Sequence, residues 1–195
     1  QAFRQLARVS RAELMFAVLA AVGVVAFGVL GGVITAVTAT LMYVMYVTAN
    51  PRDALLGRVP GDHALCKLHL NPEAEPVPET VIWLFESSIW FFNADAFRRR
   101  ARDVLALAGR ARWFVLDAEA MTHADADAVE ALFALKRDLD ACGTEMMIAG
   151  GHGWFRMAME RSGLIEAVGR DQVFFCVEQA VEAIEQRRQA SPSPA

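Results

Sequence analysis

The sequence predicts a membrane-embedded helical hairpin followed by a small α/β domain. Residues 14–47 contain no charged residue, and from residue 80 onward short apolar runs alternate with amphipathic helical patterns. Such alternation is typical of a mixed β-sheet with a parallel portion, covered by helices. The composition agrees with a membrane segment, because 55% of the residues are hydrophobic and the mean hydropathy is +0.28.

The uncharged run predicts two helices rather than one. A signal peptide has an apolar core of only ~7–15 residues. One straight helix over residues 14–47 would rise about 51 Å, against a hydrocarbon core of about 30 Å. The glycine-rich residues 28–32 are the place where such a helix breaks most easily. Each arm would then span about 22 Å, which suits packing against other membrane helices. A buried hairpin of a soluble protein is the alternative.

Arginines flank the run on both sides. The five arginines are Arg4, Arg8, Arg11, Arg52 and Arg58. By the positive-inside rule, both ends of the hairpin are expected in the cytoplasm. The first residue is Gln1 rather than Met, so we expect the chain to be a piece of a longer protein.

The overall charge and the cysteines exclude other classes. A net charge of -4 does not provide the basic face that nucleic-acid binding requires. Cys66, Cys142 and Cys176 lie far apart in the sequence and are odd in number. This pattern argues against a disulfide scaffold and indicates a reducing compartment.

Residues 51–79 combine several prolines with alternating charge and are expected to form a linker, within which residues 63–70 are a candidate first strand. His63, Cys66 and His69 have a spacing that raises the question of a zinc site. On a strand Cys66 would face away from both histidines, and on a helix the two histidines would diverge. With no fourth ligand in view, we expect no metal site and no cofactor.

Residues 80–188 are expected to form the folded domain, and residues 189–195 a disordered tail. Strands are predicted in residues 80–87, 111–118, 144–151 and 171–176. Helices are predicted from Asn93 to Gly109, from Asp125 to Gly143, over 154–163 and over 177–188.

Four stretches together resemble a known family. They are "GRVPG" at 57–61, "NPEAEPVPE" at 71–79, "FFNADAFRRR" at 91–100 and "VLDAEAMTHADADAVEAL" at 115–132. Their order after a short hairpin resembles the C-terminal end of a bacterial sulfate permease (SulP) family anion transporter. The resemblance makes residues 1–50 the last two transmembrane segments and the α/β domain a STAS domain.

The resemblance implies a function for the whole transporter. It implies a multi-pass protein of the bacterial inner membrane that moves sulfate, bicarbonate or dicarboxylates, with the STAS domain in the cytoplasm for assembly and regulation. Implied partners are the remaining transmembrane segments, a second copy in a homodimer and a cytoplasmic regulatory protein. The substrate site would lie upstream, so this segment alone would not transport. The alternative is a self-contained, membrane-anchored STAS adaptor that recruits a cytoplasmic partner.

The resemblance also points to a regulatory surface. Related anti-sigma-factor antagonists begin the matching helix with Asp-Ser, and the serine is phosphorylated. Matching that pattern places Asp125 at the aspartate, Ala126 at the phosphorylated serine and Asp127 at the following Ser/Thr. Ala126 has no hydroxyl group, so phosphorylation there is impossible. We expect these three residues to form a regulatory or partner-contact surface, although carboxylates at a helix start also act as caps.

Catalytic interpretations lack supporting residues. An Asp117 phospho-acceptor needs a lysine nearby, but Lys67 and Lys136 do not follow apolar strands. "GGHG" at 150–153 lacks the remaining residues of a phosphate-binding loop. We therefore expect no enzymatic activity.

Two further groups have simple explanations. Ser87, Ser88 and Ser162 have no evident His/Asp partners for nucleophilic catalysis. The arginines at 98–100 are expected to form a solvated helix face or to contact anionic membrane lipid.

Overall fold

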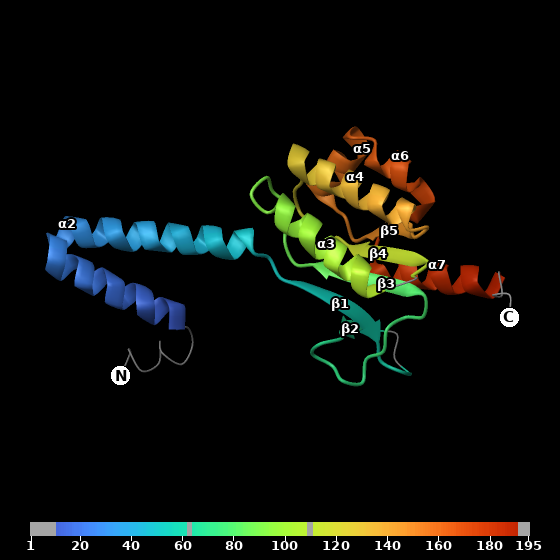
Figure 1. The fold of residues 1–195 in the computed structure, drawn as a ribbon, viewed down its shortest axis with the longest axis horizontal. Helices are drawn as coiled ribbons and strands as arrows, with labels where there is room; N and C mark the ends of the chain where they lie inside the picture. Colours follow the sequence, from blue (N-terminus) through green and yellow to red (C-terminus); the bar gives the residue numbers. More distant parts are fainter. Residues whose placement is uncertain (1–10, 62–63, 109–110, 191–195) are drawn as a thin grey trace. The chain divides into compact units, whose positions relative to one another are not determined.

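The structure, a computed structural model, describes residues 11–61, 64–108 and 111–190. The chain divides into two compact units, Gln1–Ala49 and Asn50–Ala195, each described here by itself. Figure 1 shows the helical first unit and the α/β second unit.

The first unit consists of α2 (Arg11–Ala49), which bends back on itself at Gly28 (Figure 1). Gly28 has φ 75° and ψ 177°, a backbone conformation that glycine adopts without strain. The expected break within residues 28–32 is therefore confirmed. The arms, residues 11–27 and 29–49, are about 26 Å and about 32 Å long. They exceed the expected 22 Å because the helix continues beyond both ends of the uncharged run and because the break lies at Gly28, the first residue of the glycine-rich stretch.

The two arms come into close contact at glycines. A Cβ atom on Gly23 would lie 3.1 Å from Gly32 Cα, and one on Gly32 would lie 2.6 Å from Val24 N. Farther from the bend, the rings of Phe16 and Tyr43 meet edge to face with their centroids 5.2 Å apart. Small residues thus let the two backbones touch, as is common between membrane helices.

Large apolar side chains cover the outside of α2. Val25 is 89% exposed, Leu30 76% and Phe27 75%. Among the described residues, α2 is the helix whose length and apolar composition would allow it to cross a membrane. A soluble hairpin would bury such side chains against a core, so this exposure favours surroundings of lipid or other membrane helices.

The second unit contains a mixed sheet, as expected, and the sheet has six strands, one more than the sequence predicted. The strands are β1 (Asp53–Arg58), β2 (Leu65–Lys67), β3 (Thr80–Phe85), β4 (Trp113–Asp117), β5 (Glu145–Ala149) and β6 (Val173–Phe174). Their order is β2-β1-β3-β4-β5-β6. Strands β3 to β6 are parallel, and β1 is antiparallel to both of its neighbours.

Residues 51–79 differ from the expected linker, because β1 lies within them and belongs to the sheet. Asp53 stands opposite Phe85 at the start of the β1–β3 pairing. The strand has only three consecutive apolar residues, and the surrounding prolines and charges conceal it in the sequence. Strand β2 lies within 63–70, the candidate position of a first strand.

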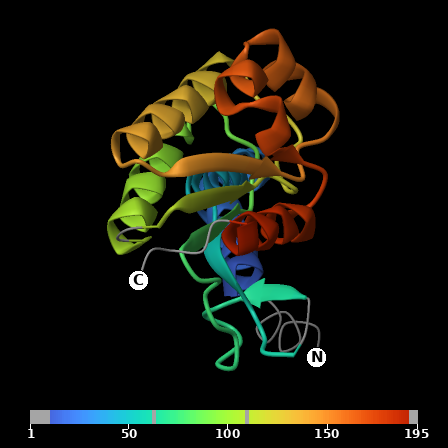
Figure 2. The ribbon, with the colours of Figure 1, turned by 90° about the vertical axis from the view of Figure 1, so that its right-hand side faces the viewer.

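Helices cover the two faces of the sheet unequally (Figure 2). One face carries α3 (Ala94–Ala108), α4 (Ala126–Ala141), α5 (Gly153–Arg161) and α6 (Leu164–Val168), and the other carries α7 (Val177–Ala190). Alternate residues of β4 divide between the two cores. Phe114 and Leu116 join the larger one, while Trp113 and Val115 pack with α7.

Most of the predicted helices are confirmed, with small differences at their ends. Gly143 follows α4 with φ 72°, as expected of a helix stop. The short α6 and the 3₁₀ turn η1 (Arg170–Gln172) were not predicted, and β6 has two residues instead of the expected six. The predicted helix end at Gly109 and tail residues 191–195 lie outside the described residues, and α7 continues to Ala190.

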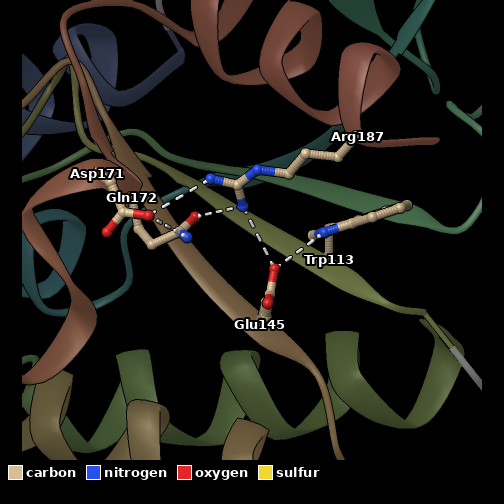
Figure 3. Close-up of polar contacts among 5 residues, drawn as sticks. All are labelled: Trp113, Glu145, Asp171, Gln172 and Arg187. Atoms are coloured by element: carbon tan, nitrogen blue, oxygen red, sulfur yellow. Dashed lines mark hydrogen bonds and ion pairs between the residues drawn. The ribbon is translucent and has the colours of Figure 1, made fainter. Parts of the chain in front are cut away.

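A polar network joins the C-terminal part of α7 to the sheet (Figure 3). Arg187 Nη1 donates to Gln172 Oε1 at 3.1 Å and lies 3.5 Å from Glu145 Oε2. Arg187 Nη2 lies 3.6 Å from Asp171 Oδ2, and Trp113 Nε1 donates to Glu145 Oε2 at 3.1 Å. One arginine therefore connects α7 with β5 and with the segment before β6.

Candidate functional site

Asp125 has two hydrogen-bonding roles at the start of α4. Its Oδ1 accepts from Ala128 N at 2.8 Å, which makes it the N-cap of the helix. Its Oδ2 accepts from Phe91 N at 2.7 Å, in the loop between β3 and α3. One carboxylate thus starts a helix and fixes a neighbouring loop, a role that its position in the sequence does not reveal.

Ser88 holds the same two loops together from the other side. Its Oγ accepts from Thr122 N at 3.0 Å and from His123 N at 3.2 Å. The ring of His123 stacks on that of Trp90 with their centroids 5.8 Å apart. Asn93 Nδ2 donates to Ser88 O at 3.1 Å. Ser88 therefore links the loop between β3 and α3 to the loop before α4.

Ala126 and Asp127 are exposed beside this loop junction. Phe91 is 70% exposed and contacts Phe92, itself 41% exposed, with ring centroids 5.1 Å apart. We call the group Phe91, Phe92, Asp125, Ala126 and Asp127 the α4-start surface. It combines two exposed aromatic rings with acidic groups. The sequence pointed to Asp125, Ala126 and Asp127 but not to the two phenylalanines, whose exposure no apolar pattern predicts.

Asp117 ends β4 and is almost fully buried, with 4% of its surface exposed. Its Oδ1 accepts from Glu119 N at 3.0 Å. Burial raises the pKa of the Asp117 carboxyl above its usual value, the bond from Glu119 N opposes this rise, and the charges of Glu119 and Glu178 add to it.

A cavity of about 420 Å³ lies beside Asp117, at the carboxyl ends of the parallel strands. Lys67 of β2 lines the same cavity, although the sequence suggested that no lysine approaches Asp117. The lysine Nζ is paired with Glu86 Oε1. The expectation that no lysine lies near Asp117 is therefore wrong, because the sequence does not reveal that β2 lies on this side of the sheet. The ammonium group of Lys67 is nevertheless engaged by Glu86 and not by Asp117.

The candidate metal ligands do not form a site in the described residues. His63 lies outside them. Cys66 Sγ donates to Gly57 O at 3.8 Å and accepts from Asn71 Nδ2 at 3.6 Å, so its contacts are structural. Across residues 11–61, 64–108 and 111–190, no group of three or more His, Cys, Asp or Glu residues is arranged to hold a metal ion.

The segment 150–153 is a tight connection between β5 and α5. Gly150 has φ 80°, and a Cβ atom there would lie 2.9 Å from Glu119 N. Gly150 therefore allows two neighbouring loops to approach each other.

The other two serines singled out in the sequence bond to nearby backbone carbonyl groups. Ser162 Oγ donates to Met159 O at 3.1 Å, and Ser87 Oγ donates to Ser88 O at 3.0 Å.

The arginines of α3 are partly neutralised by acids. Arg98 lies 3.5 Å from Asp95 and 3.4 Å from Glu130, and Arg100 lies 3.4 Å from Asp53. These pairs leave less positive charge for lipid headgroups than the sequence of three arginines suggests. Lipid contact by this helix face remains a prediction.

Comparison with known proteins identifies the family. Residues 71–180 match the STAS domain model. A probable sulfate transporter of Mycobacterium tuberculosis is 34% identical over 186 residues, which are 95% of this chain and 33% of that protein. The chain thus spans about a third of the length of that relative.

Solved structures share the fold. The murine Solute Carrier 26 family member A9 anion transporter in the inward-facing state aligns with a TM-score of 0.82 and 20% identity, over 94% of this chain and 30% of the other. The SulP transporter STAS domain from Vibrio cholerae aligns with a TM-score of 0.52 and 17% identity, over 64% of this chain and 94% of the other. The resemblance drawn from the sequence is confirmed, and the chain belongs to the STAS domain family.

Proposed function

We propose that the chain supplies the last two membrane segments and the STAS domain of a SulP-type secondary anion transporter. The observation that carries the proposal is similarity to a probable sulfate transporter over 95% of the chain, which includes both the hairpin and the α/β unit. The exposed apolar surface of α2 supports a membrane position for the hairpin. The transported ion would be sulfate or a related anion such as bicarbonate or a dicarboxylate.

The hairpin would cross the bacterial inner membrane twice. Arginines precede and follow it, so the positive-inside rule favours the cytoplasm for both ends and for the STAS domain, residues 80–188 with β1 and β2 added. The outward-facing apolar side chains of α2 would contact lipid and the remaining membrane segments. We further propose assembly as a homodimer.

The STAS domain would act by binding rather than by catalysis. Asp117 would lack the free lysine that phosphoryl transfer needs, because Lys67 beside it is engaged by Glu86. Ala126 has no hydroxyl group at the position where related regulators carry their phosphorylated serine. Regulation would therefore depend on contacts and not on phosphorylation at Ala126.

We also propose that the α4-start surface contacts a protein partner. Exposed Phe91 and Phe92 provide apolar area, and Asp127 provides negative charge beside them. A partner with exposed apolar and basic side chains would complement this surface. The same observation favours the second candidate function, a membrane-anchored adaptor that recruits a cytoplasmic protein.

Vesicle experiments test the transport role. The purified 195-residue chain, reconstituted in liposomes, should show no sulfate uptake above that of empty liposomes, because two helices enclose no pathway. Uptake by the chain alone would contradict the proposal. In cells, a membrane-impermeant maleimide should label exposed Cys142 in inverted vesicles and not in intact spheroplasts. Labelling of intact spheroplasts would contradict the cytoplasmic placement of the STAS domain. It would thereby contradict both candidate functions, since each requires that placement.

A further inference from the structure

The cavity beside Asp117 has no role in the proposed transport or in the α4-start surface. It lies at the carboxyl ends of β4 and β5, next to the first turn of α7. Crevices at the carboxyl ends of parallel strands are the usual ligand positions in α/β sheets. Its volume of about 420 Å³ is within the range of small-molecule sites.

Asp117 lines the cavity with an incompletely bonded carboxyl group. The side chain is 4% exposed, and its Oδ1 accepts from Glu119 N. In the described part of the chain, Oδ2 receives no hydrogen bond. Oδ2 is not among the described buried atoms that lack a partner, so this oxygen is reached from the cavity, where a ligand can donate a hydrogen bond to it.

The other charges of the wall favour a cationic donor. Glu119 and Glu178 line the same cavity. Its one lysine, Lys67, is already paired with Glu86. A ligand carboxylate or phosphate would meet these acids at short range, whereas an ammonium or amidinium group would be attracted. The described residues provide no metal-binding group here, which leaves an organic cation.

Much of the remaining wall is apolar, although His152, Cys66 and Cys176 also line the cavity. Leu56 and Leu84 come from neighbouring strands, and Val177 comes from the first turn of α7. We propose that this cavity binds a small organic cation whose ammonium or amidinium group donates to Asp117 while its short apolar body packs against Leu56, Leu84 and Val177. The site would give the STAS domain a small-molecule input separate from the α4-start surface.

Binding to the full chain in lipid nanodiscs tests the site. The probes are n-butylammonium, n-butanol and n-butyrate, which share a chain length and differ in charge. Leucine methyl NMR should show saturable shifts of Leu56 and Leu84 with n-butylammonium at millimolar concentrations, as ligand efficiency predicts for so few atoms. Weaker shifts are expected with n-butanol, and none with n-butyrate.

Three variants test which acidic side chains attract the cation. Asp117→Asn keeps the shape and an acceptor for Glu119 N, and it should weaken n-butylammonium binding at least about tenfold. Glu178→Gln, at an exposed position, should weaken it about threefold. Asp138→Asn, an exposed acid of α4 outside the cavity, should leave the affinity unchanged.

Several results would overturn the site. They are equal or tighter binding of n-butyrate, absence of methyl shifts with n-butylammonium, and unchanged affinity in Asp117→Asn. If Asp117→Asn fails to fold, an unchanged affinity in Glu178→Gln has the same meaning. Because binding is measured and not uptake, the outcome is independent of the transport role.

Discussion

Asp125 Oδ2 lies 2.7 Å from Phe91 N, so the residue that caps α4 also holds the loop before α3. The backbone of an exposed aromatic residue is thereby attached to the start of a second helix. This bond makes Phe91, Phe92, Ala126 and Asp127 one surface and not two separate loops.

Asp125→Ala should destabilise the domain by about 1–2 kcal/mol, because it removes the N-cap and the acceptor of Phe91 N together. Urea unfolding followed by tryptophan fluorescence measures the change. Asp127→Ala is the matched control, since Asp127 is exposed and does not cap the helix. Its expected effect is about 0.5 kcal/mol or less. Equal effects of the two variants would contradict the double role of Asp125.

Asp117→Asn should change how stability depends on pH. Burial raises the pKa of Asp117 in the folded protein, so the folded state holds the proton more tightly than the unfolded state. The contribution of Asp117 to stability is therefore present at low pH and is lost as the pH rises from the unfolded pKa through the folded one. Relative to the original protein, Asp117→Asn should become more stable as the pH increases above about 4.

Urea unfolding of both proteins across this pH range measures that difference. Asp138→Asn, an exposed acid, should show a nearly constant difference from the original protein. A difference for Asp117→Asn that falls with increasing pH would contradict the raised pKa.

Cysteine cross-linking tests the hairpin. Phe16 and Tyr43 have ring centroids 5.2 Å apart, so Phe16→Cys with Tyr43→Cys should cross-link efficiently in membranes after Cys66, Cys142 and Cys176 are replaced by serine. Gly32→Leu should reduce the yield, since even a Cβ atom at Gly32 would lie 2.6 Å from Val24 N.

The control pair for this test is Phe27→Cys with Tyr43→Cys. Phe27 lies beside the bend and is 75% exposed, far along the arm from the partner of Tyr43. It should not cross-link. Similar yields for both pairs would rule out the described alignment of the arms.

Arg187→Met should loosen the attachment of α7. The variant loses the hydrogen bond to Gln172 and the ion pairs to Glu145 and Asp171. Because these groups are partly exposed, the expected cost is only about 1 kcal/mol. Hydrogen exchange should show faster exchange at the C-terminal end of α7, while α4 stays unchanged. Arg188→Met, whose nearest acid Glu79 lies 3.9 Å away, is the control and should have little effect.

Local signals predicted much of the fold. The glycine-rich residues 28–32 located the hairpin bend, and the position of Asp125 before a periodic apolar pattern located the start of α4. Both features depend on a few consecutive residues, which is why the sequence alone reveals them. The short apolar stretch of β1 did not reveal a strand, since its pairing partner β3 lies more than twenty residues away along the chain.

The cavity beside Asp117 and the α4-start surface were harder to predict, because both are formed by residues far apart in the sequence. Lys67 and Asp117 are fifty positions apart in the sequence, yet both line one cavity. Phe91 joins Asp125 through a backbone N–H, a contact that no side-chain pattern can indicate. The sequence therefore located the acids at the start of α4 and could not identify their neighbours in space.

A chimera tests the central claim most directly. This chain would replace the matching 186 residues of the probable sulfate transporter of Mycobacterium tuberculosis, in cells that lack their own sulfate uptake. We expect the chimera to restore uptake of labelled sulfate, and the same chimera with Gly32→Leu to lose much of it at equal membrane abundance. A chimera that inserts into the membrane at normal abundance and moves no sulfate would contradict the assignment of this chain to an anion transporter.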